Sequence, residues 1–332
     1  MRVFESTEDV GGSPPARGFQ KLSQLRPCGP GVRLILKTMK TNPQNLIATL
    51  ALFTGLAVTT SARAEDWAAK APAPVTNPVF FEEPFIRSEI RPLFIYQSLG
   101  KTLPVGGAYV PVGGSVQVYA VEVRWAVTDR LAIIATKDGY VDFKPDATLT
   151  KASGWADISL GLKYAVIDDR ENQFILTPGV ELELPTGNQD VFQGNGSGEW
   201  DVFVSGAKGW GNLTLMGNVG ARLPMNMAQE TAQLHYSAQL AHHTHKYFVP
   251  FIAANAFTVL NSGRQIALGV EGFDLINFGA TGAAGSTQAA LGGGFRSKLH
   301  DKIELGFAYE RSLTNPRGVF DDRFTVDFVI RF

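Results

Sequence analysis

Apolar and polar residues alternate along most of this chain from residue 85 onwards. In the last ten residues Phe324, Val326, Phe328, Ile330 and Phe332 share one face, opposite Thr325, Asp327 and Arg331. Similar segments of roughly 9 to 14 residues recur, whereas the 3.6-residue period of an amphipathic helix does not. Strands that cross an outer membrane have this form, with apolar residues toward lipid and polar residues toward the lumen.

The alternation predicts an all-β fold, a transmembrane antiparallel up-and-down β-barrel of about 12 strands. Segments 131–140 and 247–260 are the weakest, because residues 131–135 are apolar on both faces and Pro250 and Asn255 disturb the phase. Losing or gaining one hairpin would give ten or fourteen strands. The expected strands are 86–99, 114–127, 131–140, 155–167, 173–184, 199–209, 213–223, 231–241, 247–260, 285–297, 303–312 and 323–332.

The connections between these segments alternate between long and short, as in bacterial barrels with long outer loops and short periplasmic turns. A soluble β-sandwich has no reason to sort its loops in this way. The long or Gly/Pro-rich connections are 100–113, 141–154, 185–198, 224–230, 261–284 and 313–322. The short ones are 128–130, 168–172, 210–212, 242–246 and 298–302.

Composition excludes several other classes. A hydrophobic fraction of 45% and a mean hydropathy of +0.01 are too low for a polytopic helical membrane protein. The same hydrophobic content is too high for a disordered chain. Thirty basic residues against 31 acidic ones give no basic excess for nucleic-acid binding. A single cysteine, Cys28, excludes a disulfide framework and a multi-cysteine metal site.

Residues 39–64 have the features of a secretory signal peptide. A cationic start precedes the apolar run 46–58, and Ala62 and Ala64 provide the small residues that a signal peptidase recognises. The alternative, a membrane anchor, is disfavoured because this run is too short to span about 30 Å of hydrocarbon. Residues 1–38 are a start-site extension or an unusually long n-region. Residues 65–84 are rich in Pro and Ala and predict a flexible periplasmic leader before the barrel, 85–332.

Three short motifs of the body are distinctive: Val127-Thr-Asp-Arg-Leu131 at a turn, Gly154-Trp-Ala-Asp-Ile-Ser-Leu-Gly-Leu-Lys-Tyr164 on a strand, and Glu183-Leu-Pro-Thr-Gly187 before a loop. In these motifs the body resembles the transporter barrels of the phenol-degradation meta-pathway (MetA-pathway) family of Gram-negative outer membranes. The terminal residues Phe324, Phe328 and Phe332 resemble the signal that the barrel-assembly machinery recognises. The resemblance implies an outer-membrane location and movement of aromatic or other hydrophobic compounds, and it supplies no binding residues.

Charged and polar residues of both signs fall on the predicted inner face. They describe either a polar, weakly acidic conduit or a closed lumen whose charges pair with one another, because an unpaired charge in a narrow interior is costly. A narrow pore gated by loops and a pore with a lateral opening remain open alternatives. The set is Arg87, Glu89, Arg91, Glu122, Arg124, Asp157, Lys163, Glu181, Glu183, Asp201, Arg222, His235, Arg296, Glu304, Glu310 and Asp327.

Other motifs carry little chemistry. His242, His243 and His245 could bind a transition metal, but a solvated turn without a metal explains them better. His235 and Ser237 are two residues apart on one strand, which is ordinary alternation and weak support for a lipid hydrolase. The long connection 261–284 is unusually apolar and is expected to fold into the barrel mouth or to pack on a partner.

The sequence therefore favours an exported outer-membrane barrel that passes small hydrophobic or aromatic solutes, without a cofactor and without catalysis. A structural or loop-displaying barrel with a closed lumen is the alternative, and an outer-membrane lipid hydrolase is the third possibility. Expected partners are outer-membrane lipids, the barrel-assembly machinery and small solutes, with no nucleic acid.

Overall fold

The computed structural model describes residues 67–315 and 317–332, so the predicted signal peptide and the extension before it lie outside the described residues. No helix in the described ranges is long and apolar enough to cross a membrane. The elements are α2 (Trp67–Lys70), β1 (Glu89–Ser98), β2 (Thr102–Val105), β3 (Ala108–Pro111), β4 (Gly114–Ala126), β5 (Leu131–Ala135), β6 (Tyr140–Pro145), β7 (Ala152–Trp155), β8 (Ile158–Tyr164), β9 (Ile167–Asp169), β10 (Phe174–Leu184), the 3₁₀ turn η1 (Gln189–Val191), β11 (Glu199–Trp210), β12 (Leu213–Pro224), β13 (Gln233–His242), β14 (Val249–Val259), β15 (Thr287–His300), β16 (Ile303–Ser312) and β17 (Asp322–Arg331).

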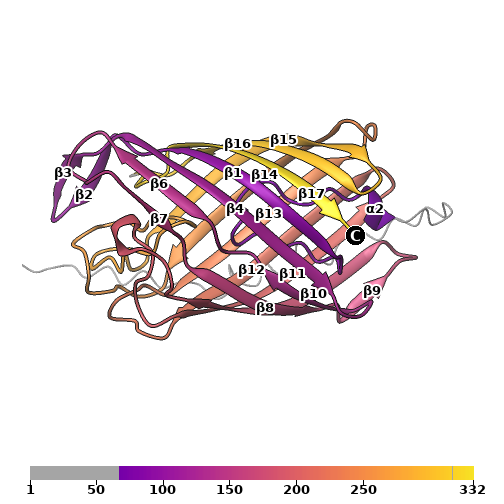
Figure 1. Cartoon of the computed structure of the whole chain (residues 1–332), viewed down its shortest axis with the longest axis horizontal. Coiled ribbons are helices and arrows are strands. Elements are labelled where there is room, and N and C mark those ends of the chain that lie inside the picture. The colour runs from indigo at the N-terminus through magenta and orange to yellow at the C-terminus, as the bar shows by residue number, and fades with distance from the viewer. Residues whose placement is uncertain (1–66, 316) are drawn as a thin grey trace, which may run out of the picture. The chain divides into compact units, whose positions relative to one another are not determined.

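The strands close into an antiparallel barrel (Figure 1). Each long strand pairs with its sequence neighbours, and β1 pairs with both β4 and β17, so Phe94 lies opposite Tyr119 on one side and Val326 on the other. β5 and β6 are two parts of one barrel strand, and β7 and β8 are two parts of the next. The predicted fold of 12 strands is confirmed. Closure pairs each long strand of the wall on both sides, as a hydrocarbon environment requires, while β7 toward the loop end pairs only with β6.

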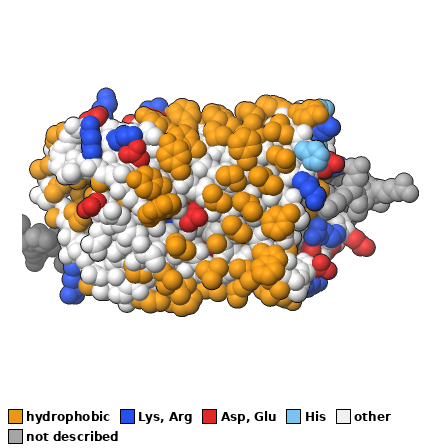
Figure 2. Space-filling view, in the orientation of Figure 1, with side chains coloured by type: hydrophobic (Ala, Val, Ile, Leu, Met, Phe, Trp, Pro, Cys, Tyr) orange, Lys and Arg blue, Asp and Glu red, His pale blue; other side chains and the backbone are white. Residues whose placement is uncertain are grey.

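The two faces of the barrel wall follow the predicted alternation. On β8, Leu160 is 60% exposed on the outside while Ser159 and Lys163 are buried inside. Figure 2 shows apolar side chains spread over the barrel wall, with most charged side chains near its two ends. This distribution matches an apolar band facing lipid.

The connections alternate as expected, and they distinguish the two ends of the barrel. We call the end with the long connections, including the β2–β3 hairpin, the loop end. The opposite end, where α2 and the C-terminus lie, is the turn end (Figure 1). β6 and β7 extend toward the loop end beyond their predicted limits, which shortens the connection between them to residues 146–151.

Two neighbouring strands are interrupted midway, and the alternation of the sequence did not predict these interruptions. Four residues, 136–139, separate β5 from β6, and they face only three residues of β4, 120–122. The extra residue makes a bulge, and Gly139 adopts a φ of +119° there. The side chain of Asp138 satisfies one backbone donor at the bulge, because it accepts a hydrogen bond from the N–H of Val121 at 2.9 Å. In the next strand, Ala156 and Asp157 both turn inward between β7 and β8.

The prediction that residues 65–84 form a flexible leader is wrong for its described part. Residues 67–88, here called the plug, lie inside the barrel, and Val75, Thr76 and Asn77 have no exposed surface. β1 begins only at Glu89, so Ile86 and Arg87 belong to the plug. Ile86 packs inward against Ala132, Ile134 and Phe203, although it was the first residue of the expected strand 86–99, whose apolar side chains were predicted to face lipid. The error arose because a Pro/Ala-rich composition shows only that the segment has no strand or helix period. It does not show whether distant strands bury the segment.

Burial of the plug can be tested by thiol labelling, because no cysteine lies among the described residues. Val75→Cys should react with a maleimide at least about tenfold more slowly than Ala69→Cys, since Val75 is fully buried and Ala69 is exposed on the same segment. The measurement is the labelling rate of folded protein in detergent, with unfolded protein as the reference. Equal rates for the two folded variants would contradict a resident plug.

Candidate functional site

The plug enters from the turn end, reverses inside the barrel and returns to the same end. The reversal begins at Asn77, which has a φ of +46° and whose carbonyl accepts a hydrogen bond from the N–H of Phe81 at 2.9 Å. Asn is one of the few non-glycine residues that adopt this conformation readily. At the return, Ser88 accepts a hydrogen bond from the N–H of Phe332 at 3.2 Å. The plug is therefore a loop and does not pass through the barrel.

Its proline-rich arm is fixed by hydrogen bonds to the wall. Arg91 donates to the carbonyl of Pro74 at 2.7 Å, and Arg296 donates to that of Ala73 at 3.1 Å. Gln239 donates to the carbonyl of Pro72 at 3.2 Å. Proline has no N–H, so an extended Pro/Ala arm presents mainly acceptors, which suits a wall lined with donors.

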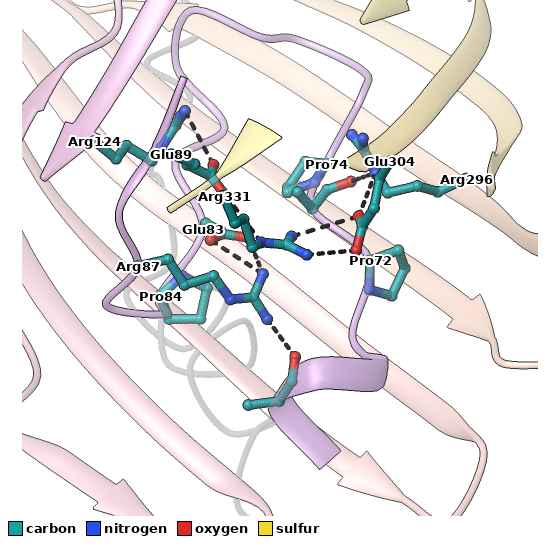
Figure 3. A network of polar contacts seen from close by, with 12 residues as sticks. Pro72, Pro74, Glu83, Pro84, Arg87, Glu89, Arg124, Arg296, Glu304 and Arg331 are labelled. Carbon is teal, nitrogen blue, oxygen red and sulfur yellow. Dashed lines mark hydrogen bonds and ion pairs between the residues drawn. The ribbon is translucent and has the colours of Figure 1, made fainter. Parts of the chain in front are cut away.

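A continuous ionic network joins the plug to the wall near the turn end, and Figure 3 shows the part of it around Arg331, Glu89 and Glu304. Arg124 contacts Glu82 of the plug at 2.5 Å and Glu122 at 2.9 Å, and Lys163 contacts Glu82 at 2.6 Å. On the other side, Arg331 bridges Glu89 and Glu304. The network comprises Arg91, Arg124, Lys163, Arg296 and Arg331 with Glu82, Glu89, Glu122, Glu304 and Asp327.

A second polar group lies closer to the loop end and is rich in carboxylates. Its contacts are Lys137–Glu183 at 2.5 Å, Arg222–Glu199 at 2.6 Å, His235–Asp201 at 2.8 Å and Thr136 to Glu181 at 2.7 Å. Asp157 accepts from the N–H groups of Gly187 and Gly194.

Two carboxyl groups in the connections at this end are shifted toward their neutral form. Burial, reinforced by the nearby carboxylates Glu199 and Glu183, raises the pKa of Glu230 to about 8. Burial also raises the pKa of Glu271, although the N–H groups of Ala280 and Phe278 donate to its carboxylate. Of the two, Glu230 therefore titrates close to neutral pH.

An apolar pocket lies between the tip of the plug and the interrupted strands. Its volume is about 40 Å³, enough for a few waters or one small group. Lys137 and Asp138 of the interruption line one edge, and Pro78 and Val79 of the plug line another. The remaining lining is mostly apolar and includes Leu93, Ile95, Val116, Val118, Val141, Ala156, Leu275 and Ile276.

The long connection 261–284 covers this pocket, as one of the two sequence expectations had it. It folds inward, and Leu268, Val270 and Ile276 join the apolar cluster of the barrel mouth. Asp274 anchors it by a fully buried ion pair with Arg323 of β17 at 2.5 Å. The loop therefore belongs to the interior of the barrel.

The structure places all of the predicted inner-face residues inside the barrel or at its inner rim. Glu89, Arg91, Glu122, Arg124, Lys163, Arg296, Glu304 and Asp327 meet in the ionic network, and Asp157, Glu181, Glu183, Asp201, Arg222 and His235 belong to the carboxylate-rich group. Glu310 accepts from the N–H of Asn77 at 3.3 Å. Arg87 pairs with Glu83 within the plug at 3.0 Å. Phe324, Phe328 and Phe332 lie on the outer surface.

The other candidate sites gain no support. His235 contacts Asp201, whereas Ser237 accepts from Asn77, so these two residues form no nucleophile–base pair. His242 contacts Thr244, and the described residues contain no group of three His, Cys, Asp or Glu side chains placed to hold a metal.

Sequence reasoning missed the residues of the plug and those of the strand interruption. Phe80 and Phe81 lie in the segment interpreted as flexible, and Phe85 follows directly after it. This aromatic density was the available sign of burial. Lys137-Asp138-Gly139 inside a predicted strand was the corresponding sign of a bulge.

The chain matches no protein-family model and no curated protein. Among solved structures it is similar to an outer membrane channel from Pseudomonas putida F1, with 17% identity, a TM-score of 0.53, and coverage of 76% of this chain and 98% of that one. Weaker likenesses are to the NanC porin (9% identity, TM-score 0.46, coverage 73% and 100%) and to the CymD monoaromatic hydrocarbon channel (9%, 0.40, coverage 75% and 89%). The first likeness supports the fold of an outer-membrane barrel.

Ionisation of Glu230 should make the protein less stable as the pH rises. The folded pKa of about 8 exceeds the ordinary value of 4.5, so the stability contributed by the neutral carboxyl is complete below pH 4.5 and is lost as the pH rises through 8. Glu230→Gln should therefore lose less stability than the unmodified protein between pH 5 and 9, by up to several kcal/mol at about 1.4 kcal/mol per pKa unit. Thermal unfolding across this range tests the difference, with the exposed Asp190→Asn as the control. Parallel curves for Glu230→Gln and the unmodified protein would disprove it.

Breaking the Arg323–Asp274 pair should release the inward loop. Arg323→Met leaves Asp274 buried without its cation and should cost about 3–5 kcal/mol, measured by unfolding in detergent. Adding Asp274→Leu should recover part of the loss, because the unpaired charge is removed. Arg311→Met breaks a more exposed pair with Asp322 and should change stability by less than about 1 kcal/mol. Similar losses for Arg311→Met and Arg323→Met would contradict this assignment.

Proposed function

We propose that this protein is an outer-membrane channel for small apolar or aromatic solutes. The observation that carries the proposal is the apolar pocket at the loop end, enclosed by the inward loop and bordered by the two interrupted strands. An apolar pocket with a few polar groups at its edge is the usual form of a site for small apolar molecules.

The plug determines the route that such a solute would take. Toward the turn end, the plug and its buried ion pairs occupy the barrel interior among the described residues. The wall beside the pocket is the place where the hydrogen-bond ladder is least regular. A solute that enters from the loop end would therefore leave sideways, through the interruption into the lipid. Apolar solutes gain from this exit, whereas ions would lose their hydration.

This proposal includes an orientation in the membrane. The loop end faces outward and the turn end faces the periplasm, as is usual for bacterial barrels. The apolar outer face contacts lipid, and the exposed Phe324, Phe328 and Phe332 form the signal for the barrel-assembly machinery. Membership of the phenol-degradation meta-pathway family belongs to the same proposal.

A closed structural barrel is the second candidate, and the plug itself favours it. Twelve strands enclose a lumen that the plug and the inward loop fill, so the barrel could serve envelope stability or loop display without transport. The two functions differ in whether the apolar pocket must stay open.

Filling the pocket should stop transport if the first candidate is correct. Ala156→Phe adds a ring beside the strand interruption, where the pocket has only about 40 Å³. We expect it to lower the uptake of radiolabelled toluene by cells carrying the protein at least about fivefold, because apolar solutes cross an outer membrane slowly without a channel. Leu160→Phe, which adds the same ring on the outer face of β8, is the matched control. If cells carrying the unmodified protein take up toluene no faster than cells lacking it, the result would instead support the structural barrel.

A further inference from the structure

Lys163 of the barrel wall depends on the plug for all of its hydrogen bonds among the described residues. Its Nζ atom donates to the Glu82 carboxylate at 2.6 Å and to the Glu83 carbonyl at 2.8 Å, and the side chain has no exposed surface. Arg124 donates to the same carboxylate through Nε and Nη2, at 3.0, 3.1 and 2.5 Å. The wall thus provides a two-cation site, and both oxygens of one carboxylate occupy it.

The charge of the ionic network balances only while Glu82 is present. Five cations and five carboxylates form the network, and Glu82 is the one member that the plug contributes. Arg124 has two further carboxylates on the wall, Glu122 and Glu89, but Lys163 has none within contact distance. Leaving a buried cation unpaired costs several kcal/mol, so an anion that replaces Glu82 lowers the cost of moving the plug away.

The wall between the two cations is apolar. β5 lies between β4 and β8, and the register places Ile134 opposite Arg124 and Ala132 opposite Lys163. Both apolar residues are buried and pack with Phe203. A ligand whose carboxylate rests on the cations would therefore have an apolar surface beside it.

The plug presents a carboxylate and an apolar side chain to this part of the wall, and these are the two groups that such a ligand would have. Glu82 supplies the carboxylate, and Ile86 supplies the apolar side chain that packs on Ala132, Ile134 and Phe203. The plug therefore occupies this part of the wall as an amphipathic acid would.

We propose that Arg124, Lys163, Ala132, Ile134 and Phe203 form a binding site for a small monocarboxylate with an apolar body, and that Glu82 and Ile86 fill it in the plugged state. The ligand and the plug then compete for one site, so binding of the acid favours release of the plug. This inference rests on the proposed function and names one class of its solutes, small carboxylic acids with an apolar body. Its test does not depend on transport.

Removal of the plug's carboxylate should expose the site to an added acid. In Glu82→Ala protein, purified in detergent, benzoate should raise the thermal unfolding temperature with saturation, and should bind at least about tenfold more tightly than it binds the unmodified protein. Benzyl alcohol, with the same ring and no charge, should have no such effect. Benzoate and benzyl alcohol acting alike would overturn the proposal.

Two further variants locate the effect. Glu83→Ala removes the neighbouring carboxylate, whose partner Arg87 belongs to the plug, so no wall cation is freed and benzoate should not stabilise it. Glu82→Ala combined with Lys163→Met should lose the benzoate response. A response to benzoate in either variant equal to that of Glu82→Ala would overturn the proposal.

The unmodified protein provides a measurement that does not depend on the folding of any Glu82 variant. Saturating benzoate should speed trypsin cleavage of the plug after Lys70 or Arg87 at least about threefold, because the acid displaces Glu82, whereas benzyl alcohol should not. An unchanged rate would contradict competition. Absent binding with intact toluene uptake would reject this site alone, and binding without uptake would reject the channel alone.

Discussion

Closure of the hydrogen-bond ladder into a ring is the constraint on which this structure depends. β1 pairs with β4 on one side and with β17 on the other, and so joins the two ends of the barrel sequence. The long strands of the wall then each have two partners, which allows their outer face to be apolar. The same closure forces the alternate side chains inward, and they carry most of the chain's buried charge. The alternation of the wall strands therefore determines which wall side chains line the lumen.

These inward charges explain why the plug is part of the core. The wall alone leaves Lys163 without a carboxylate, and Glu82 supplies it, while Arg91 and Arg296 hold the carbonyls of the arm. Glycines on the wall make room for the plug: a Cβ on Gly306 would lie 2.8 Å from the side chain of Val75. Both the charge and the shape of the wall therefore fit this segment.

Much of the fold could be predicted because its rules are local. Alternation assigned Leu160 to the outside and Lys163 to the inside, and the turn and loop lengths gave the order of the strands. The inward loop 261–284 was anticipated from its apolar residues, with a partner surface as the alternative. Ile86 was included in the expected strand 86–99, with its apolar side chain toward lipid, because alternation was extended beyond the true start of β1. The bulge at residues 136–139 was missed because one extra residue breaks the phase only locally.

The sequence by itself determined the barrel, its strand order and which side chains face inward, because a period of two is set by the backbone of each strand. Only the tertiary structure decided which charges meet and what fills the lumen. Lys163 and Glu82 lie 81 residues apart, and the apolar pocket brings together the plug, two interrupted strands and a distant loop. Such contacts depend on the curvature and closure of the whole sheet, and no local pattern encodes them.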